Sequence, residues 1–312
     1  MDKWIYFFDE GRASDKALLG GKGANLAEMT HLGLPVPEGF TITTQSCLRY
    51  LETPSFFESI LKEEVLKAIT RLESKTGENF TGEGSNLLLV SVRSGAKFSM
   101  PGMMDTILNL GLNDQRTQIL AKETNLDFAY NCYRRLLQMY ADVVYGIDKG
   151  LFDEQLAAFE EKLAKKVQDF DLSQHQELIK HYKDLYFKYD HHFPEDPNEQ
   201  LYAAIQAVFK SWNNHRARIY RELHQIPHDL GTAVNVQAMV FGNSDQHSGT
   251  GVCFTRNPAT GEAELFGEFL LNAQGEDVVA GIRTPEPIEA LKEIQPETYQ
   301  AFRDYANVLE NH

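Results

Sequence analysis

The sequence predicts an α+β fold, in which strands and helices are mixed at both ends of the chain around a helical middle. The first 112 residues combine short apolar strand-like runs at residues 4–8, 40–44 and 87–92 with an amphipathic helix at 56–75. From residue 113 glycine becomes sparse and apolar residues recur at helical spacing, which predicts about four helices. We therefore expect an α/β segment followed by a helical one.

The prolines of FPEDPNE mark a boundary near residue 197, after which the pattern changes again. One long helix is expected at residues 198–225. Strand-like runs follow at residues 232–241 and in GVCFTRNP and ELFGEFLLNAQGED, and residues 287–312 are expected to be helical. The predicted organisation is a first segment at 1–112, a helical subdomain at 113–197 and a second α/β segment at 198–312.

Composition and charge limit the classes of partner. The chain has 312 residues, of which 42% are hydrophobic and 24% charged, and its net charge is −15. Such a charge opposes binding to nucleic acid or to anionic membranes. An acidic protein that binds a polyanion must gather its few cations locally, so each isolated Lys or Arg is informative.

Cysteine use and the N-terminal sequence predict a cytoplasmic protein. Cys47, Cys132 and Cys253 are scattered and odd in number, and no CxxC pair is present. The N-terminal residues lack the features of a signal peptide. No apolar run approaches the roughly 20 residues that span a bilayer.

A phosphate site is indicated at residues 87–111, LLLVSVRSGAKFSMPGMMDTILNLG. An apolar run ends at Arg93, whose planar guanidinium suits bidentate phosphate binding. The small residues Ser94, Gly95 and Ala96 follow, so a ligand can approach the backbone closely. The alternative is a structural arginine that pairs with a carboxylate in the core.

A second anion site is indicated near the N-terminus. Gly20, Gly21 and Gly23 bracket Lys22, and residues 24–31 have the composition and spacing of a helix. A glycine-rich turn that enters a helix N-terminus can bind an anion. The spacing is not that of a Walker P-loop. The alternative is an ordinary turn with a solvated lysine.

Three further patterns have competing interpretations. The small and polar residues of GNSDQHSGTG can join two antiparallel strands as a flap, with the amides of residues 248–251 facing phosphate, or form only a mobile tip. Arg134 and Arg135 are adjacent on an aromatic-rich helix, so at most one can face a given target. The pair His191 and His192 fits a loop better than a metal site.

Five motifs in this sequence resemble the nucleotide-binding part of the pyruvate phosphate dikinase family. They are LLGGKGANLAEM, the Arg93 stretch, TAVNVQAMVFGN, SGTGVCFTRNPATGE and GEFLLNAQGEDVVAGIRTP. The resemblance covers essentially the whole chain but only the family's N-terminal third. It implies an ATP-binding domain of the ATP-grasp type, with an inserted helical subdomain.

The resemblance also implies roles for nine residues. Lys22 is expected to reach the nucleotide phosphates, Arg93 to stabilise charge on them during transfer, and Arg135 to help enclose them. The hinge for adenine is expected at Gln237, Met239 and Val240, the phosphate-covering flap at Gly251 and the loop before it, and the ribose site at Glu276 and Asp277.

The activity implied by the resemblance is transfer of the β-phosphoryl group of ATP, through a phosphohistidine on a separate swivelling domain, to pyruvate. The products are phosphoenolpyruvate, AMP and pyrophosphate, and the cofactor is Mg²⁺ with ATP. The implied partners are ATP, the swivelling domain and a pyruvate-binding barrel, in a homodimer, with no nucleic acid and no membrane. Phosphoenolpyruvate synthases and antibiotic phosphotransferases share the outline, and a non-catalytic nucleotide-binding module is a third alternative.

One departure from the family pattern concerns the C-terminal segment. The family continues with a strand pair that carries two acidic magnesium ligands and a Gln-x-Arg, and no such segment occurs in these 312 residues. We therefore expect no metal ligands in this chain, weak ATP affinity and incomplete turnover. We also expect an unpaired sheet edge that invites association.

Overall fold

The computed structural model describes residues 3–82, 84–100, 102, 104–280 and 283–312, without the side chains of residues 276, 279 and 280. Contacts divide the chain into two compact units, Met1–Met239 and Val240–His312. This division differs from the three segments expected at 1–112, 113–197 and 198–312, because strand β5 and helix α8 from the third segment join the sheet of the first. The α+β class is confirmed.

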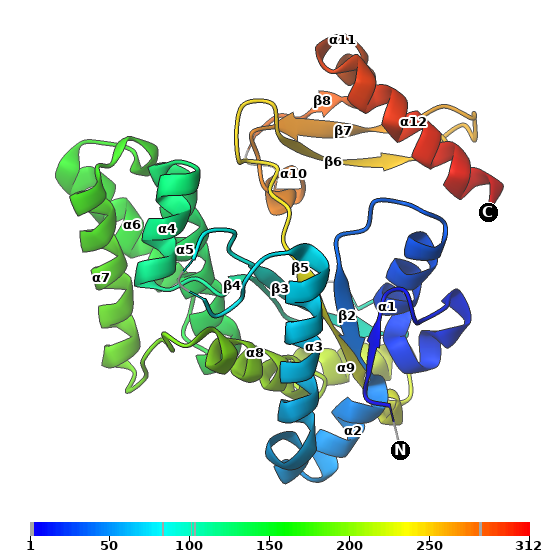
Figure 1. Cartoon of the computed structure of the whole chain (residues 1–312), viewed down its shortest axis with the longest axis horizontal. Coiled ribbons are helices and arrows are strands. Elements are labelled where there is room, and N and C mark those ends of the chain that lie inside the picture. The colour runs from blue at the N-terminus through cyan, green and yellow to red at the C-terminus, as the bar shows by residue number, and fades with distance from the viewer. Residues whose placement is uncertain (1–2, 83, 101, 103, 281–282) are drawn as a thin grey trace. The chain divides into compact units, whose positions relative to one another are not determined.

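The first unit is built on a five-stranded antiparallel sheet in the order β1-β2-β5-β3-β4 (Figure 1). The strands are β1 (Ile5–Phe7), β2 (Gly39–Ile42), β3 (Val90–Ala96), β4 (Thr106–Leu110) and β5 (Thr232–Ala238). The central strand comes from the end of the unit's sequence, so the sheet forms only when distant segments meet.

The helices of the first unit are α1 (Lys16–His31), α2 (Thr44–Glu52), α3 (Lys62–Thr76), α4 (Asp114–Glu123), α5 (Leu126–Tyr140), α6 (Gly150–Leu163), α7 (Leu172–Lys188), α8 (Pro197–Ser211) and α9 (His215–Leu223). Helices α4 to α7 confirm the helical segment expected after residue 113. Figure 1 shows them grouped beside β4, against which α5 packs. The α3 helix ends at Thr76, close to the end at residue 75 that the sequence predicts, and Gly77 caps it in the left-handed conformation, with φ of 72°.

The single helix expected at residues 198–225 is wrong, because α8 ends at Ser211 and α9 begins at His215. Asn214 caps α9 by accepting a hydrogen bond from the amide of Ala217. Trp212, between the helices, is buried and donates its indole N–H to the carbonyl of His228. Arg221, in the last turn of α9, is fully buried and stacks on the Trp212 ring.

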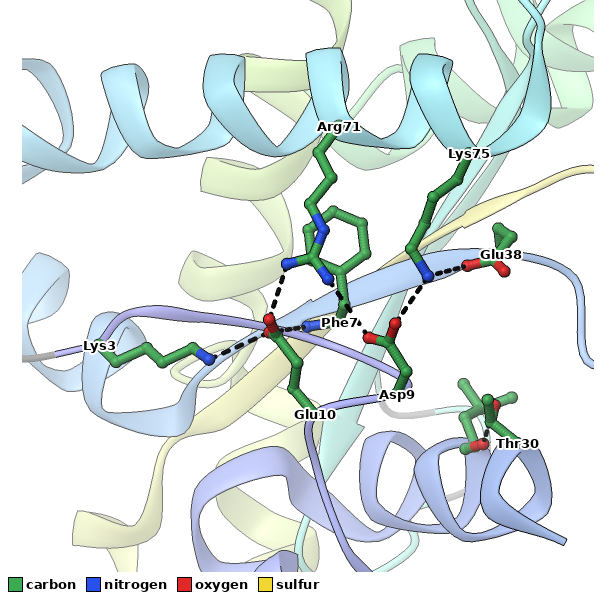
Figure 2. A network of polar contacts seen from close by, with 9 residues as sticks. Lys3, Phe7, Asp9, Glu10, Thr30, Glu38, Arg71 and Lys75 are labelled. Carbon is green, nitrogen blue, oxygen red and sulfur yellow. Dashed lines mark hydrogen bonds and ion pairs between the residues drawn. The ribbon is translucent and has the colours of Figure 1, made fainter.

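An ion-pair network joins α3 to the segments around β1 and β2 (Figure 2). Arg71 pairs with Asp9 and Glu10 and stacks on the ring of Phe7, 3.9 Å from its centroid. Lys75 bridges Asp9 and Glu38 at 2.8 and 3.1 Å. These contacts fasten α3 over the edge strand β1 and protect that edge.

The second unit is a three-stranded antiparallel sheet in the order β6-β7-β8, with α12 across one face (Figure 1). Its elements are β6 (Gly249–Phe254), β7 (Phe266–Leu271), α10 (Gly275–Ala280), β8 (Glu286–Pro287), α11 (Leu291–Ile294) and α12 (Pro296–Asn311). Residues 232–241 and the GVCFTRNP strand at 251–258 do not pair as the two strands of one flap, which was one of the two interpretations of the loop between them. β5 pairs with β2 and β3, whereas β6 pairs with β7 in a separate sheet.

None of the described helices is both long enough and apolar enough to cross a lipid bilayer.

Candidate functional site

The central sheet of the first unit has one apolar face and one polar face. Alternate residues of a strand point to opposite faces. Val92, Val234 and Val236 are fully buried on the apolar face. On the other face, Thr41 lies opposite Asn235, Asn235 opposite Arg93, and Arg93 opposite Thr106. A row of polar side chains therefore crosses four strands in the middle of the unit.

Helix α1 approaches the sheet closely at two glycines. A Cβ atom on Gly23 would lie 2.7 Å from Thr41 Oγ1 and 2.9 Å from Asn235 Oδ1. A Cβ atom on Gly20 would lie 1.5 Å from the carbonyl oxygen of Gly95. The absence of side chains at these positions lets the helix approach the end of β3 closely.

The glycine-rich segment expected as a turn lies inside α1, which is interrupted at Gly20, with φ of 68° and ψ of 172°. Gly21, Lys22 and Gly23 therefore form the first turn of the helical stretch that follows the break. The first amides of a helix lack helical partners and carry partial positive charge. Lys22 therefore lies at a helix N-terminus, whose amides favour a bound anion in addition to the charge of the lysine.

A cavity of about 630 Å³ opens at this helix start. Its walls come from α1, from the end of β3 and from the connection between β3 and β4. The described lining residues are Lys16, Gly21, Lys22, Asn25, Ser94, Gly95, Ala96, Lys97, Phe98, Ser99, Met100, Gly102, Met104 and Thr106. Three of them are lysines and none is acidic, although the chain carries a net charge of −15.

Lys22 and Arg93 interact electrostatically in this region. Desolvation by the surrounding protein, together with the positive charge of Arg93, lowers the pKa of Lys22 to about 8. Burial also lowers the pKa of Arg93. Two cations that repel each other at short range favour an anion placed beside both.

Arg93 itself is incompletely satisfied. Its Nη2 donates to Gln237 Oε1, while its buried Nε has no hydrogen-bond partner among the described residues. No described carboxylate forms an ion pair with it, so the structural arginine paired in the core, which was the alternative interpretation, is not what the structure contains.

Arg116 shows what a structural arginine looks like in the same unit. It is 2% exposed and donates to the carbonyls of Gly111, Asn79, Gly82 and Leu88 and to the side chain of Asn79. Its hydrogen-bonding capacity is used in holding the loop between α3 and β3. Arg93, by contrast, retains capacity for a ligand.

The predicted phosphate residue Arg135 lies on α5, away from the lining of the Lys22 cavity. It is half-buried, with Nε 3.4 Å from Asn131 Oδ1. Its neighbour Arg134 donates from Nη2 to the same oxygen at 3.0 Å. Arg135 is not among the described residues that line the cavity.

Two predicted hinge residues lie at the end of β5. Gln237 is 5% exposed, and its side chain contacts Arg93 and the carbonyl of Pro37. The amide N–H of Met239 donates to the carbonyl of Leu89 at 2.8 Å and is not available to a base. The third, Val240, belongs to the second unit and is 72% exposed.

Gly251, expected in a flap, lies within β6 opposite Phe269. A Cβ atom there would lie 2.8 Å from the carbonyl oxygen of Glu268. In the loop before it, the amide of Ser248 already donates to the Asp245 carboxylate at 2.8 Å. Some of the amides expected to face phosphate therefore already take part in hydrogen bonds within the loop or in the pairing of β6 with β7.

The predicted ribose residues fall on α10. The side chain of Glu276 lies outside the described residues. Asp277 is described, and its Oδ2 accepts a hydrogen bond from the amide of Gln274 at 2.9 Å, which stabilises the first turn of the helix.

No cluster of three or more His, Cys, Asp or Glu side chains that could hold a metal occurs in the described parts of the chain. His191 and His192 lie in a loop, as expected, where the ring of His191 stacks on Tyr145.

Sequence reasoning missed two cavity residues, Lys16 and Lys97. Lys97 follows directly after the small residues 94–96, which was a usable signal. Lys16 begins α1 at a position that carries no motif in the sequence.

Comparisons with known proteins agree with the motifs. The family model described as pyruvate phosphate dikinase, AMP/ATP-binding domain, matches residues 16–63 and 53–303. The pyruvate, phosphate dikinases of Clostridium symbiosum and Rhizobium meliloti (strain 1021) are each 52% identical over 100% of this chain, which covers 36% and 37% of their lengths. Chloroplastic pyruvate, phosphate dikinase 1 of Arabidopsis thaliana is 50% identical over 99% of the chain, which covers 33% of its length. The chain thus spans about a third of these curated relatives.

Proposed function

Because this chain belongs to the pyruvate phosphate dikinase family and matches its AMP/ATP-binding domain, we propose that the cavity beside Lys22 and Arg93 receives the phosphates of ATP. The observation that carries this proposal is the concentration of cations at the cavity. Three lysines line it, Arg93 lies beside Lys22, and no described lining residue is acidic.

The residues of the cavity can stabilise phosphate charge without covalent chemistry. Phosphoryl transfer through a loose transition state depends on positioning and charge neutralisation. The Lys22 ammonium supplies a compact charge, the start of the helical stretch after Gly20 supplies amides, and Arg93 has donors left for oxygens. Mg²⁺, which accompanies ATP, neutralises further phosphate charge when bound. The described residues do not provide a cage for it.

The proposal extends to the whole enzyme through the resemblance and the names of the relatives. In it, a phosphohistidine on another domain carries the β-phosphoryl group of ATP to pyruvate in a cytoplasmic homodimer. The assignments of Arg135, Gln237, Met239, Val240, Gly251, Glu276 and Asp277 remain predictions within this proposal.

The direct test is calorimetric titration of the 312-residue chain with ATP and with adenosine. Lys22→Ala and Arg93→Ala should each weaken ATP binding roughly 10- to 100-fold, the effect of removing a charged hydrogen bond. Adenosine, which lacks phosphates, should bind each variant as it binds the wild type.

The matched control is Lys122→Ala, which removes one positive charge from the exposed end of α4, away from the cavity. It should leave ATP affinity within about twofold of the wild type. Equal losses in Lys122→Ala and Lys22→Ala would show that only net charge matters and would refute the site.

A further inference from the structure

The structure assigns to Gln237 a role that its expected place in an adenine hinge does not include. We propose that the Gln237 side chain is a positioning residue that orients the Arg93 guanidinium for phosphate while leaving its positive charge uncancelled. This inference rests on the proposed function of Arg93 as a phosphate ligand.

The side chain of Gln237 has a fixed orientation. It is 5% exposed, and its Nε2 donates to the carbonyl of Pro37 at 2.9 Å. A carbonyl can only accept, so the amide nitrogen must face Pro37 and Oε1 must face away from it. Arg93 Nη2 donates to that oxygen. The carbonyl before β2 is thereby linked, through one amide group, to the guanidinium on β3.

Among the described residues, Gln237 supplies the one hydrogen-bond acceptor that the structure shows for Arg93. Asn235 lies directly opposite Arg93, but its Oδ1 accepts a hydrogen bond from Thr41 Oγ1 at 2.8 Å. Gln237 lies two residues further along β5, at the diagonal position, which a long side chain can reach. The sheet register therefore selects this contact.

The chemistry of the acceptor explains why an amide suits this position. A carboxylate would hold the guanidinium more strongly, but it would cancel the charge and compete with phosphate. An amide oxygen is neutral, so it fixes the direction of Arg93 without reducing the attraction for an anion. Burial also restricts the rotation of the Arg93 side chain. Phosphate binding therefore costs less conformational entropy than it would with a freely rotating arginine.

Two substitutions separate orientation from charge. Gln237→Met keeps the length and volume but removes the acceptor, so Arg93 becomes free to rotate. ATP should then bind roughly three- to tenfold more weakly, which corresponds to ordering one long side chain. Gln237→Glu should keep the guanidinium oriented but pair it with a carboxylate, and ATP should again bind more weakly.

The matched control is Ser91→Ala. Ser91 lies opposite Gln237 on the same face, is 4% exposed and donates only to the backbone carbonyl of Gln237. Its removal perturbs the same strand pair without touching the Arg93 contact, so ATP affinity should not change.

Calorimetry of ATP binding gives the first readout. Gln237→Met should have no further effect on ATP affinity in an Arg93→Ala background, because its effect acts through Arg93. An undiminished loss in that background would overturn the inference.

Arginine-selective NMR of the ligand-free chain gives a second readout that does not depend on nucleotide binding. The Arg93 Nη groups should give distinct signals from restricted rotation in the wild type, Gln237→Glu and Ser91→Ala, and an averaged signal in Gln237→Met. Rotation that is equally restricted in Gln237→Met would refute the positioning role. If the wild type fails to bind ATP while the NMR pattern is as expected, the proposed function fails and the Gln237 contact stands.

Discussion

Lys22 is the residue of the candidate site whose pKa is brought near physiological pH. Its pKa of about 8 results from desolvation and from the charge of Arg93, so its ammonium loses its proton just above physiological pH. A bound phosphate favours the charged form. Binding of ATP above pH 8 must therefore be accompanied by proton uptake at Lys22.

We expect ATP affinity to be constant below about pH 7.5 and to fall as the pH rises through 8. Calorimetry at pH 8.5 in buffers of different ionisation enthalpy should detect the uptake of protons. Lys22→Arg keeps a permanent charge, so its affinity should stay flat across this range. A wild-type profile as flat as that of Lys22→Arg would contradict the assignment.

Gly20 is the backbone position on which the placement of Lys22 depends. Its φ of 68° disfavours any residue with a Cβ, and such an atom would lie 1.5 Å from the carbonyl oxygen of Gly95. Gly20→Ala should lower the free energy of unfolding by about 3 kcal/mol, from the backbone and packing costs together.

The matched control for Gly20→Ala is Gly33→Ala. Gly33 has a similar φ of 75°, but nothing lies within 4 Å of the added Cβ position. Only the backbone cost of about 1 kcal/mol applies. Urea unfolding of both variants measures the difference, and equal destabilisation would show that α1 does not press on β3 as described.

At the scale of elements, Arg116, which is buried, and Arg93, which is partly buried, should differ in how much their substitution affects stability. Arg116 donates hydrogen bonds to several backbone carbonyls and so holds the α3–β3 loop. Among the described residues, Arg93 donates a hydrogen bond only to Gln237. Arg116→Met should lower the free energy of unfolding by about 3 kcal/mol. Arg93→Met should change it by less than about 1 kcal/mol, because an uncompensated buried charge is lost.

Denaturant titration of both arginine variants provides the measurement. If Arg93→Met proves the more damaging of the two, Arg93 is a structural residue and the contrast between them is wrong.

The ion pairs that fasten α3 to β1 give a pH-dependent contribution to stability (Figure 2). Partial burial raises the pKa of Glu10, but hydrogen bonds from Arg71, the Phe7 amide and Lys3 outweigh it and lower the pKa to about 2. The folded pKa lies below the ordinary glutamate value of 4.5, so the contribution is complete above pH 4.5 and is lost as the pH falls toward 2.

We expect Glu10→Gln to lower the free energy of unfolding by about 1 kcal/mol at pH 7, and the difference from the wild type to shrink between pH 4.5 and 2. Glu154→Gln, on the exposed side of α6, serves as the control and should show no such trend. A difference that stays constant with pH would mean that the Glu10 charge does not contribute.

At the scale of the whole molecule, local sequence patterns predicted where helices and strands form better than they predicted which strands pair. The helical spacing after residue 113 and the glycine at 77 are local signals, and the structure agrees with both. Which strands pair is decided by contacts between distant segments. The sequence between β5 and β6 is typical of a hairpin loop, yet each strand finds its neighbours elsewhere.

The candidate site was predictable to a similar extent. Lys22 and Arg93 stand out because each is a lone cation among small residues, and the structure places them close enough to interact. The contact of Gln237 with Arg93 depends on the register of β3 against β5, and a single sequence does not reveal it. The helix break between Ser211 and His215 depends on burial of Trp212, which helical spacing does not signal.

The 312 residues span about a third of the length of the relatives, so we expect them to perform only part of the proposed reaction. We expect them to bind ATP without converting pyruvate to phosphoenolpyruvate, because the proposed phosphohistidine lies on another domain. An assay with ATP, phosphate and pyruvate, followed by detection of phosphoenolpyruvate, tests this expectation. Product formed by these residues alone would contradict it.

The most direct measurement is a crystal structure of the chain with a non-hydrolysable ATP analogue. We expect phosphate oxygens within hydrogen-bonding distance of both Lys22 Nζ and the Arg93 guanidinium, at the helix start after Gly20. An analogue whose phosphates contact neither residue, with the cavity beside them empty, would contradict this expectation.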